Sequence, residues 1–124
     1  MDLFNLEIFA NDTINYSYNL ALANSNTSWT AQTQVVTLDY AEIFDNNNVN
    51  VGILTTTINP LTNSGNSDNF TINFIANSYQ TVWFANGGVN PSERTLIIQT
   101  SLMSNTGIVQ HANNIYLIVR TATL

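Results

Sequence analysis

The segment Ile14-Asn15-Tyr16-Ser17-Tyr18-Asn19-Leu20-Ala21-Leu22 decides the fold class, because large apolar side chains alternate along it with small or polar ones. Successive side chains of a β-strand point to opposite faces of the sheet, so a period of two indicates a strand with one buried face. We expect the even-numbered residues of this segment to face the core and the odd-numbered residues to face solvent.

Further strand-like runs follow on both sides of this segment. Stretches rich in Asn, Ser, Gly and Pro separate them, and these residue types favour turns. The last run, Ile115 to Thr121, is apolar at nearly every position, which indicates a strand covered on both faces. Residues 39–44 are the only plausible helical turn. The expected strands are 3–9, 14–23, 29–38, 49–58, 70–76, 79–85, 95–103, 108–110 and 115–121, with a tight hairpin at Asn77-Ser78.

Eight or nine short strands joined by polar turns predict an all-β protein. We expect one domain, residues 1–124, folded as an antiparallel β-sandwich or jelly roll of about eight strands with little or no helix. A β-solenoid is the structural alternative, but it would need a repeat of fixed period, and the sequence shows none.

Charged residues are scarce in this chain. There are eight acidic and two basic residues among 124, the basic ones being Arg94 and Arg120, and the formal net charge is −6. Lysine is absent altogether. Nucleic acids and anionic membranes are bound by clusters of Lys and Arg, so the composition argues against both as partners. At 44% apolar residues, the chain is also too hydrophobic for a disordered segment.

The sequence carries no recognisable targeting or membrane-spanning segment. No stretch approaches the roughly 20 apolar residues that a membrane helix needs. Acidic residues stand at the N-terminus where a signal peptide would have basic ones. We therefore expect synthesis in the cytoplasm of a host cell without secretion through a signal peptide.

Residues able to do chemistry are few. His111 is the only histidine and cysteine is absent, so we expect no enzyme activity, no cofactor and no metal ion. Asp39, Glu42 and Asp45 recur every three residues and could supply oxygen ligands to calcium. Their spacing matches no EF-hand loop, so a solvated turn is the preferred interpretation.

Aromatic and amide side chains are the remaining candidates for ligand or partner contact. Trp29, Tyr79 and Trp83 could form a platform for sugar rings or a protein partner, with Asn86 and Asn90 donating and accepting hydrogen bonds. Packing of the aromatic residues in the core is the simpler interpretation, because aromatic side chains dominate the cores of β-sandwiches.

The missing lysines bear on function through the edges of the sheet. β-proteins commonly guard unpaired edge strands with lysine or proline, and this chain has no lysine and only Pro60 and Pro91. We expect other subunits to cover the edges. Trypsin-like proteases would have only two sites. These properties favour a structural component of a virus or phage particle, a capsid decoration or minor capsid protein, that contacts other virion proteins or itself as a homo-oligomer. A carbohydrate-binding module or adhesin-type lectin domain is the alternative, with glycans as partners, and an ice-binding protein is a third.

Overall fold

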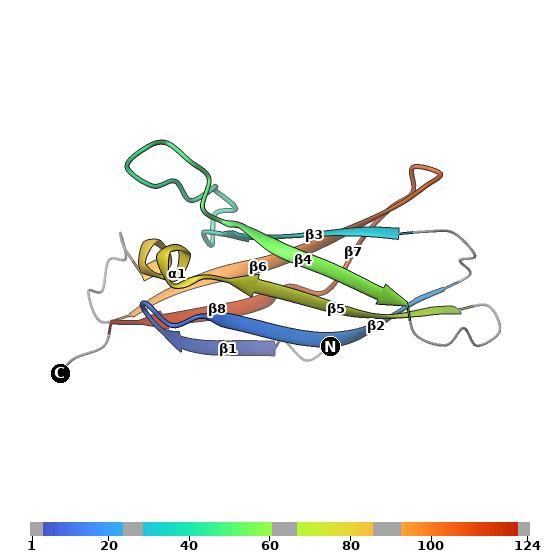
Figure 1. Cartoon of the computed structure of the whole chain (residues 1–124), viewed down its shortest axis with the longest axis horizontal. Coiled ribbons are helices and arrows are strands. Elements are labelled where there is room, and N and C mark those ends of the chain that lie inside the picture. Colours follow the sequence, from blue (N-terminus) through green and yellow to red (C-terminus); the bar gives the residue numbers. More distant parts are fainter. Residues whose placement is uncertain (1–3, 24–28, 61–66, 86–92, 122–124) are drawn as a thin grey trace.

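The computed structural model describes residues 4–23, 29–60, 67–85 and 93–121, and it confirms the all-β prediction there (Figure 1). One short helix accompanies eight strands in these residues. The elements are β1 (Phe4–Phe9), β2 (Ile14–Ala23), β3 (Trp29–Val36), β4 (Ile53–Pro60), β5 (Ser67–Ala76), α1 (Ser78–Ala85), β6 (Glu93–Ser104), β7 (Val109–His111) and β8 (Ile115–Arg120).

The strands form one mixed sheet in the order β1-β8-β6-β3-β4-β5-β2, with β7 beside β6. The described pairs are antiparallel except β1 with β8, which run parallel. β4 joins the two halves of the sheet, because Ile53 and Leu54 pair with β3 whereas residues 55–60 pair with β5. The two layers expected of a sandwich are therefore parts of one sheet that is nearly closed into a barrel.

The core forms where the inward side chains of the two halves meet. In β2, Ile14 is buried and Tyr16, Tyr18 and Leu20 are half-buried, while Asn15, Ser17 and Asn19 are exposed, as the alternation predicts. β8 lies between β1 and β6 as an interior strand of the sheet, but only one of its faces is fully buried, because burial alternates from Ile115 to Arg120. The fully buried side chains include Val35, Ile72, Phe74, Phe84, Leu96, Ile98, Leu102, Leu117 and Val119.

The strand and hairpin predicted around residues 77–85 are wrong, because this segment is helix α1. Asn77 and Gln80 cap its start reciprocally. The Gln80 backbone N–H donates to Asn77 Oδ1 at 2.9 Å, and the Asn77 backbone N–H donates to Gln80 Oε1 at 2.9 Å. Thr81 and Phe84, one turn apart, then reach the core with no exposed surface. No helix among the described residues is long and apolar enough to cross a membrane.

Residues 37–52 form a projecting loop, which we term the hook. The helical turn predicted at 39–44 is absent. Instead Tyr40 has a φ of 64° and its N–H donates to Thr37 O, and Phe44 forms an isolated bridge with Asn50. β4 consequently begins later than predicted, at Ile53, and it continues through Pro60 rather than ending before it.

Candidate interaction surface

The five residues predicted to contact a ligand or partner are only partly brought together. Tyr79 and Trp83 lie one turn apart on α1, with ring centroids 6.4 Å apart and an interplanar angle of 63°. They share a face of a helix rather than the predicted strand face. Trp29 is 8% exposed and packs at the start of β3 in a core cluster with Phe70, Ile72 and Leu102, to which no residue of α1 belongs. Asn86 and Asn90 lie outside the described residues.

Tyr79 is held in place by a carboxylate of the hook. Its hydroxyl donates to Asp45 Oδ2 at 2.7 Å, while Asp45 Oδ1 accepts the backbone N–H groups of Asn47 at 2.8 Å and Val49 at 3.0 Å. The Val49 N–H and the Tyr79 hydroxyl lower the pKa of Asp45, and the same carboxylate raises the pKa of Tyr79. Asp45 therefore acts as a structural acceptor that fixes both the loop and the ring.

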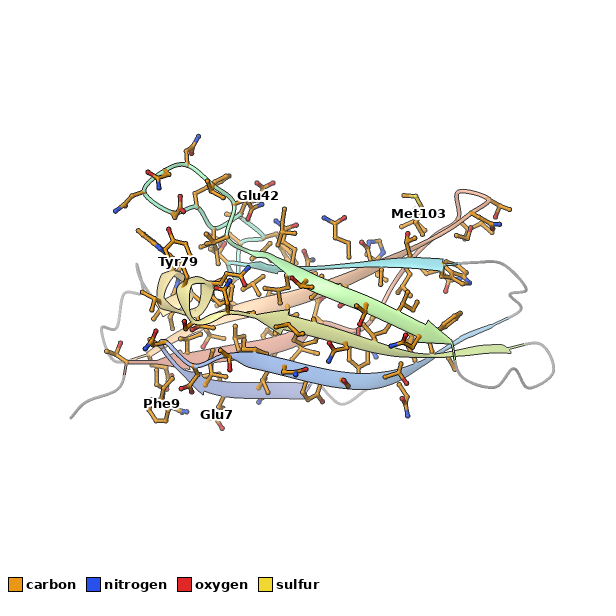
Figure 2. All side chains as sticks on the ribbon, in the orientation of Figure 1. Glu7, Phe9, Glu42, Tyr79 and Met103 are labelled. Carbon is orange, nitrogen blue, oxygen red and sulfur yellow. The ribbon has the colours of Figure 1, made fainter. Side chains whose placement is uncertain are left out.

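Gln80 makes a second connection between α1 and the hook. Its side-chain NH₂ donates to the backbone carbonyls of Val51 at 3.0 Å and Ile53 at 2.9 Å. The helix and the hook thus form one unit at this end of the molecule, near the labels of Tyr79 and Glu42 in Figure 2.

This unit exposes large apolar side chains, and we name the surface the α1 end. It comprises Leu38, Tyr40, Phe44, Val49, Tyr79 and Val82, which are between 43% and 58% exposed. Exposed large apolar side chains gathered on one hydrogen-bonded unit are candidates for contact with a partner. Of the residues of the α1 end, the sequence predicts only Tyr79 as a contact, because the others come from segments whose structures differ from the predicted ones.

The acidic residues of the hook do not gather into a metal site. Both carboxylate oxygens of Asp45 already accept hydrogen bonds from Asn47, Val49 and Tyr79. Glu42 Oε2 accepts a hydrogen bond from the Asn50 side chain at 3.2 Å. Among the described residues no group of three or more His, Asp or Glu side chains could hold an ion. The carboxylates of Asp45 and Glu42 stabilise the turns of the loop.

The outer face of β3, β6 and β7 carries amide and apolar side chains. His111 lies opposite Ser101, beside a shallow depression of about 170 Å³ that is also lined by Gln32, Gln34 and Gln99. A neighbouring groove of about 500 Å³ is bordered by three exposed apolar residues, Ile53, Met103 and Val109. Figure 2 shows Met103 on this side of the molecule.

The two edge strands of the sheet, β1 and β2, differ in whether charged residues guard them against pairing with another strand. At the β1 end, Arg120 of β8 pairs with Glu7 of β1 and, at 3.2 Å, with Glu93 of β6. β2, at the other end, is ten residues long and has neither a charged residue nor a proline. Such charge-free edges are prone to pair with another strand.

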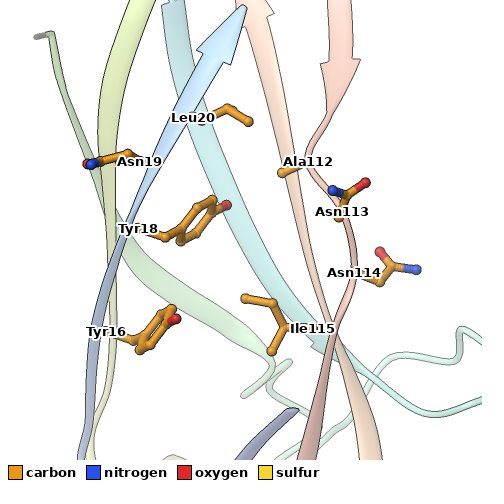
Figure 3. Close-up of a pocket in the computed structure, with 8 residues that line it drawn as sticks. All are labelled: Tyr16, Tyr18, Asn19, Leu20, Ala112, Asn113, Asn114 and Ile115. Atoms are coloured by element: carbon orange, nitrogen blue, oxygen red, sulfur yellow. The ribbon is translucent and has the colours of Figure 1, made fainter. Parts of the chain in front are cut away.

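A pocket of about 230 Å³ lies beside β2, between Tyr16 and Tyr18 on one side and residues 112–115 on the other (Figure 3). The β1–β8 ladder starts at the pair Phe4–Ile115, so it stops where this pocket begins. Burial raises the pKa of Tyr18. The Tyr18 hydroxyl is buried and reaches no partner within hydrogen-bonding distance among the described residues.

Comparison with known proteins does not assign a family. No protein-family model matches the chain, and no curated protein matches its sequence. One similar solved structure is that of AggA, the major subunit of aggregative adherence fimbriae type I from Escherichia coli, at 9% identity over 96% of this chain and 90% of that chain. Its TM-score of 0.32 is too low to carry an argument about the site or the function.

Proposed function

We propose that this protein is a non-enzymatic structural subunit of a virus or phage particle, a capsid decoration or minor capsid component. It is made in the host cytoplasm and acts through contacts with other virion proteins or with copies of itself. The observation that carries the proposal is the α1 end, where six exposed large apolar side chains lie on a helix and a hydrogen-bonded loop.

The chemistry of the α1 end suits a protein partner. Interface cores are depleted in lysine and charged residues and enriched in aromatic ones, and this surface contains Tyr40, Phe44 and Tyr79. The Asp45 bond holds the Tyr79 ring in one position before any partner arrives, so less side-chain entropy is lost on binding.

The positions of the two arginines, the only sites for trypsin-like proteases, support a role outside cells, where such proteases are encountered. The Arg94 side chain is partly buried and its Nη1 donates to Phe84 O at 3.2 Å. Arg120 is held between Glu7 and Glu93. Both lie within strands, so trypsin-like cleavage at either residue requires local opening of the sheet.

Mass spectrometry of purified particles tests the proposal. We expect the chain among the stoichiometric components of the virion, and recombinant chain should rebind to particles that lack it. Val82→Asp should abolish rebinding by placing a charge in the α1 end, whereas Thr57→Asp, on an exposed position of β4, should leave it intact. A chain found only in the soluble fraction of infected cells and never on particles would disprove the role.

Carbohydrate binding is the second candidate, favoured by the adjacent rings of Tyr79 and Trp83, because aromatic rings can stack on sugars. A glycan array distinguishes the two functions. Binding that Tyr79→Ala abolishes and Ile75→Ala preserves would favour the glycan hypothesis, and an array without signal would count against it.

A further inference from the structure

The edge strand β2 contains a segment whose central five residues, Asn15 to Asn19, read the same in both directions and are flanked by similar aliphatic residues. On either side of Ser17 stand first a tyrosine, then an asparagine, and then an isoleucine or leucine, in Ile14-Asn15-Tyr16-Ser17-Tyr18-Asn19-Leu20. We propose that this segment pairs with the same segment of a second copy in an antiparallel β-ladder centred on Ser17. The inference rests on the proposed structural role and names a second copy as the partner.

The symmetry of the segment matches the symmetry of the contact. A two-fold interface brings the same surface of both subunits together. In an antiparallel ladder centred on Ser17, that residue lies opposite its own copy, and Tyr16 lies opposite Tyr18 of the second copy. Asn15 then lies opposite Asn19 of the second copy. Each side chain meets one of its own kind, and directly opposed aromatic or polar pairs stabilise a sheet.

One edge of β2 forms no strand pair among the described residues. One side of the strand pairs with β5 over the whole range Ile14–Ala23, and β2 is the last strand of the sheet on its other side. The absence of charge within β2 means that two copies, each of net charge −6, would meet without like charges inside the ladder.

The outward side chains of β2 are already ordered for lateral pairing. Asn73 Nδ2 donates to Asn15 Oδ1 at 2.8 Å and to Ser17 Oγ at 2.8 Å, and Thr71 Oγ1 donates to Asn19 Oδ1 at 3.1 Å. These bonds run across the sheet from β5 to β2. A second copy of β2 would continue the same row, with Asn15 of one copy opposite Asn19 of the other.

The inward side chains leave a surface that a second copy would cover. The rings of Tyr16 and Tyr18 are 6.3 Å apart and half-buried, and they border the pocket of Figure 3. The other residues lining that pocket are uncharged, namely Asn19, Leu20, Ala112, Asn113, Asn114 and Ile115. Pairing would bring the Tyr16 ring of the second copy beside Tyr18, whose hydroxyl makes no hydrogen bond within the described residues.

Single-cysteine cross-linking tests the pairing and its register in a chain that has no cysteine of its own. Directly opposed residues of antiparallel strands have Cα atoms about 4.5 to 5.5 Å apart, within the range that a disulfide spans. Ser17→Cys should therefore give a disulfide-linked dimer as the main product of mild oxidation. Ala21→Cys is the matched control on the same strand face, because its two copies would be about 27 Å apart and should yield only a trace of dimer.

Sedimentation equilibrium supplies an independent measurement. A ladder of seven residue pairs buries less than the roughly 1,600 Å² of a standard interface, so we expect a dimer with a Kd of about micromolar or weaker. Ser17→Lys places two ammonium groups opposite each other and should weaken the dimer at least about tenfold. Ile75→Lys adds the same charge to the same outer face on β5, the strand next to β2, and should dimerise like the wild type. Circular dichroism melts confirm that each variant is folded.

The pairing is overturned if the wild type stays monomeric, if Ser17→Cys cross-links no better than Ala21→Cys, or if Ser17→Lys dimerises as the wild type does. These outcomes leave the structural role standing, because rebinding to particles measures that role separately. Loss of particle binding together with an intact Ser17-centred dimer would refute the role and retain the pairing.

Discussion

Gly52 is the residue at which the hook returns to the sheet, and Gly52→Ala should destabilise the fold by steric conflict alone. The Val35 N–H donates to Gly52 O at 2.8 Å, which brings the two backbones together. A Cβ at Gly52 would lie 2.3 Å from Val35 O and 3.2 Å from Asn50 Oδ1. The Val35 oxygen belongs to the buried strand β3 and cannot rotate away, so the backbones must separate.

The expected cost of this overpacking is about 2 kcal/mol, in the middle of the range of about 1 to 3 kcal/mol for an inserted methyl group. A chain of this length has an unfolding entropy of about 260 cal/mol/K, so the melting temperature should fall by roughly 8 °C. Differential scanning calorimetry measures the shift directly.

Gly107 provides a control in which alanine would cause backbone strain rather than a steric clash. Its φ is +90°, but a Cβ there would meet nothing within 4 Å. Gly107→Ala should cost about 1 kcal/mol through backbone strain, and Gly107→Asn should recover part of it because asparagine tolerates left-handed geometry. At Gly52, asparagine should be no better than alanine. A Gly52→Ala protein that melts within about 2 °C of the wild type would refute the steric argument.

Three further predictions concern the cap, the carboxylate and the arginines. Asn77→Ala should destabilise the protein by about 1 kcal/mol through loss of the α1 cap, measured by urea unfolding, and Gln80→Ala should cost more because Gln80 also binds the hook. The pKa of Asp45 is lower in the folded state than in the unfolded state, where it is about 4. The ionised carboxylate therefore stabilises the fold fully above about pH 4, and this stabilisation is lost as the pH falls through the pKa of the folded state. Asp45→Asn should consequently be less sensitive than the wild type to acid between pH 7 and 3. Trypsin should cut after Arg94 only when β6 opens, so this cleavage should be slow in native buffer and should accelerate as urea unfolds the protein. Rapid cleavage in native buffer would contradict the strand position of Arg94.

The strands could be predicted from the sequence because each buries one face, and period-two alternation follows directly from that geometry. The helix α1 could not, because Tyr79, Thr81, Val82, Trp83 and Phe84 all favour strands by composition. The deciding local signal was the asparagine followed three residues later by a glutamine, which satisfies backbone groups at a helix start. Burial of Thr81 and Phe84 then outweighed the strand propensity of the segment.

The interaction surface could be predicted only in part for the same reason. Tyr79 and Trp83 share a face at the spacing of a strand, and they meet in the structure because a spacing of four residues also shares a helix face. The residue type of Trp29 does not distinguish the core from the surface. The contribution of the hook depends on Asp45 and Gln80, whose partners are 34 and between 27 and 29 residues away in sequence. No local pattern reports such contacts.

The placement of the few charges gives the absence of lysine a structural meaning. At the β1 end of the sheet, one of the two arginines joins three strands through Glu7 and Glu93. At the β2 end, ten consecutive residues carry no charge at all. Charge on an edge strand opposes pairing with a neighbour, so this distribution disfavours association at one end of the sheet and permits it at the other. Copies would then associate through the uncharged β2 edge rather than through the β1 edge. The net charge of −6 would keep unassembled copies soluble.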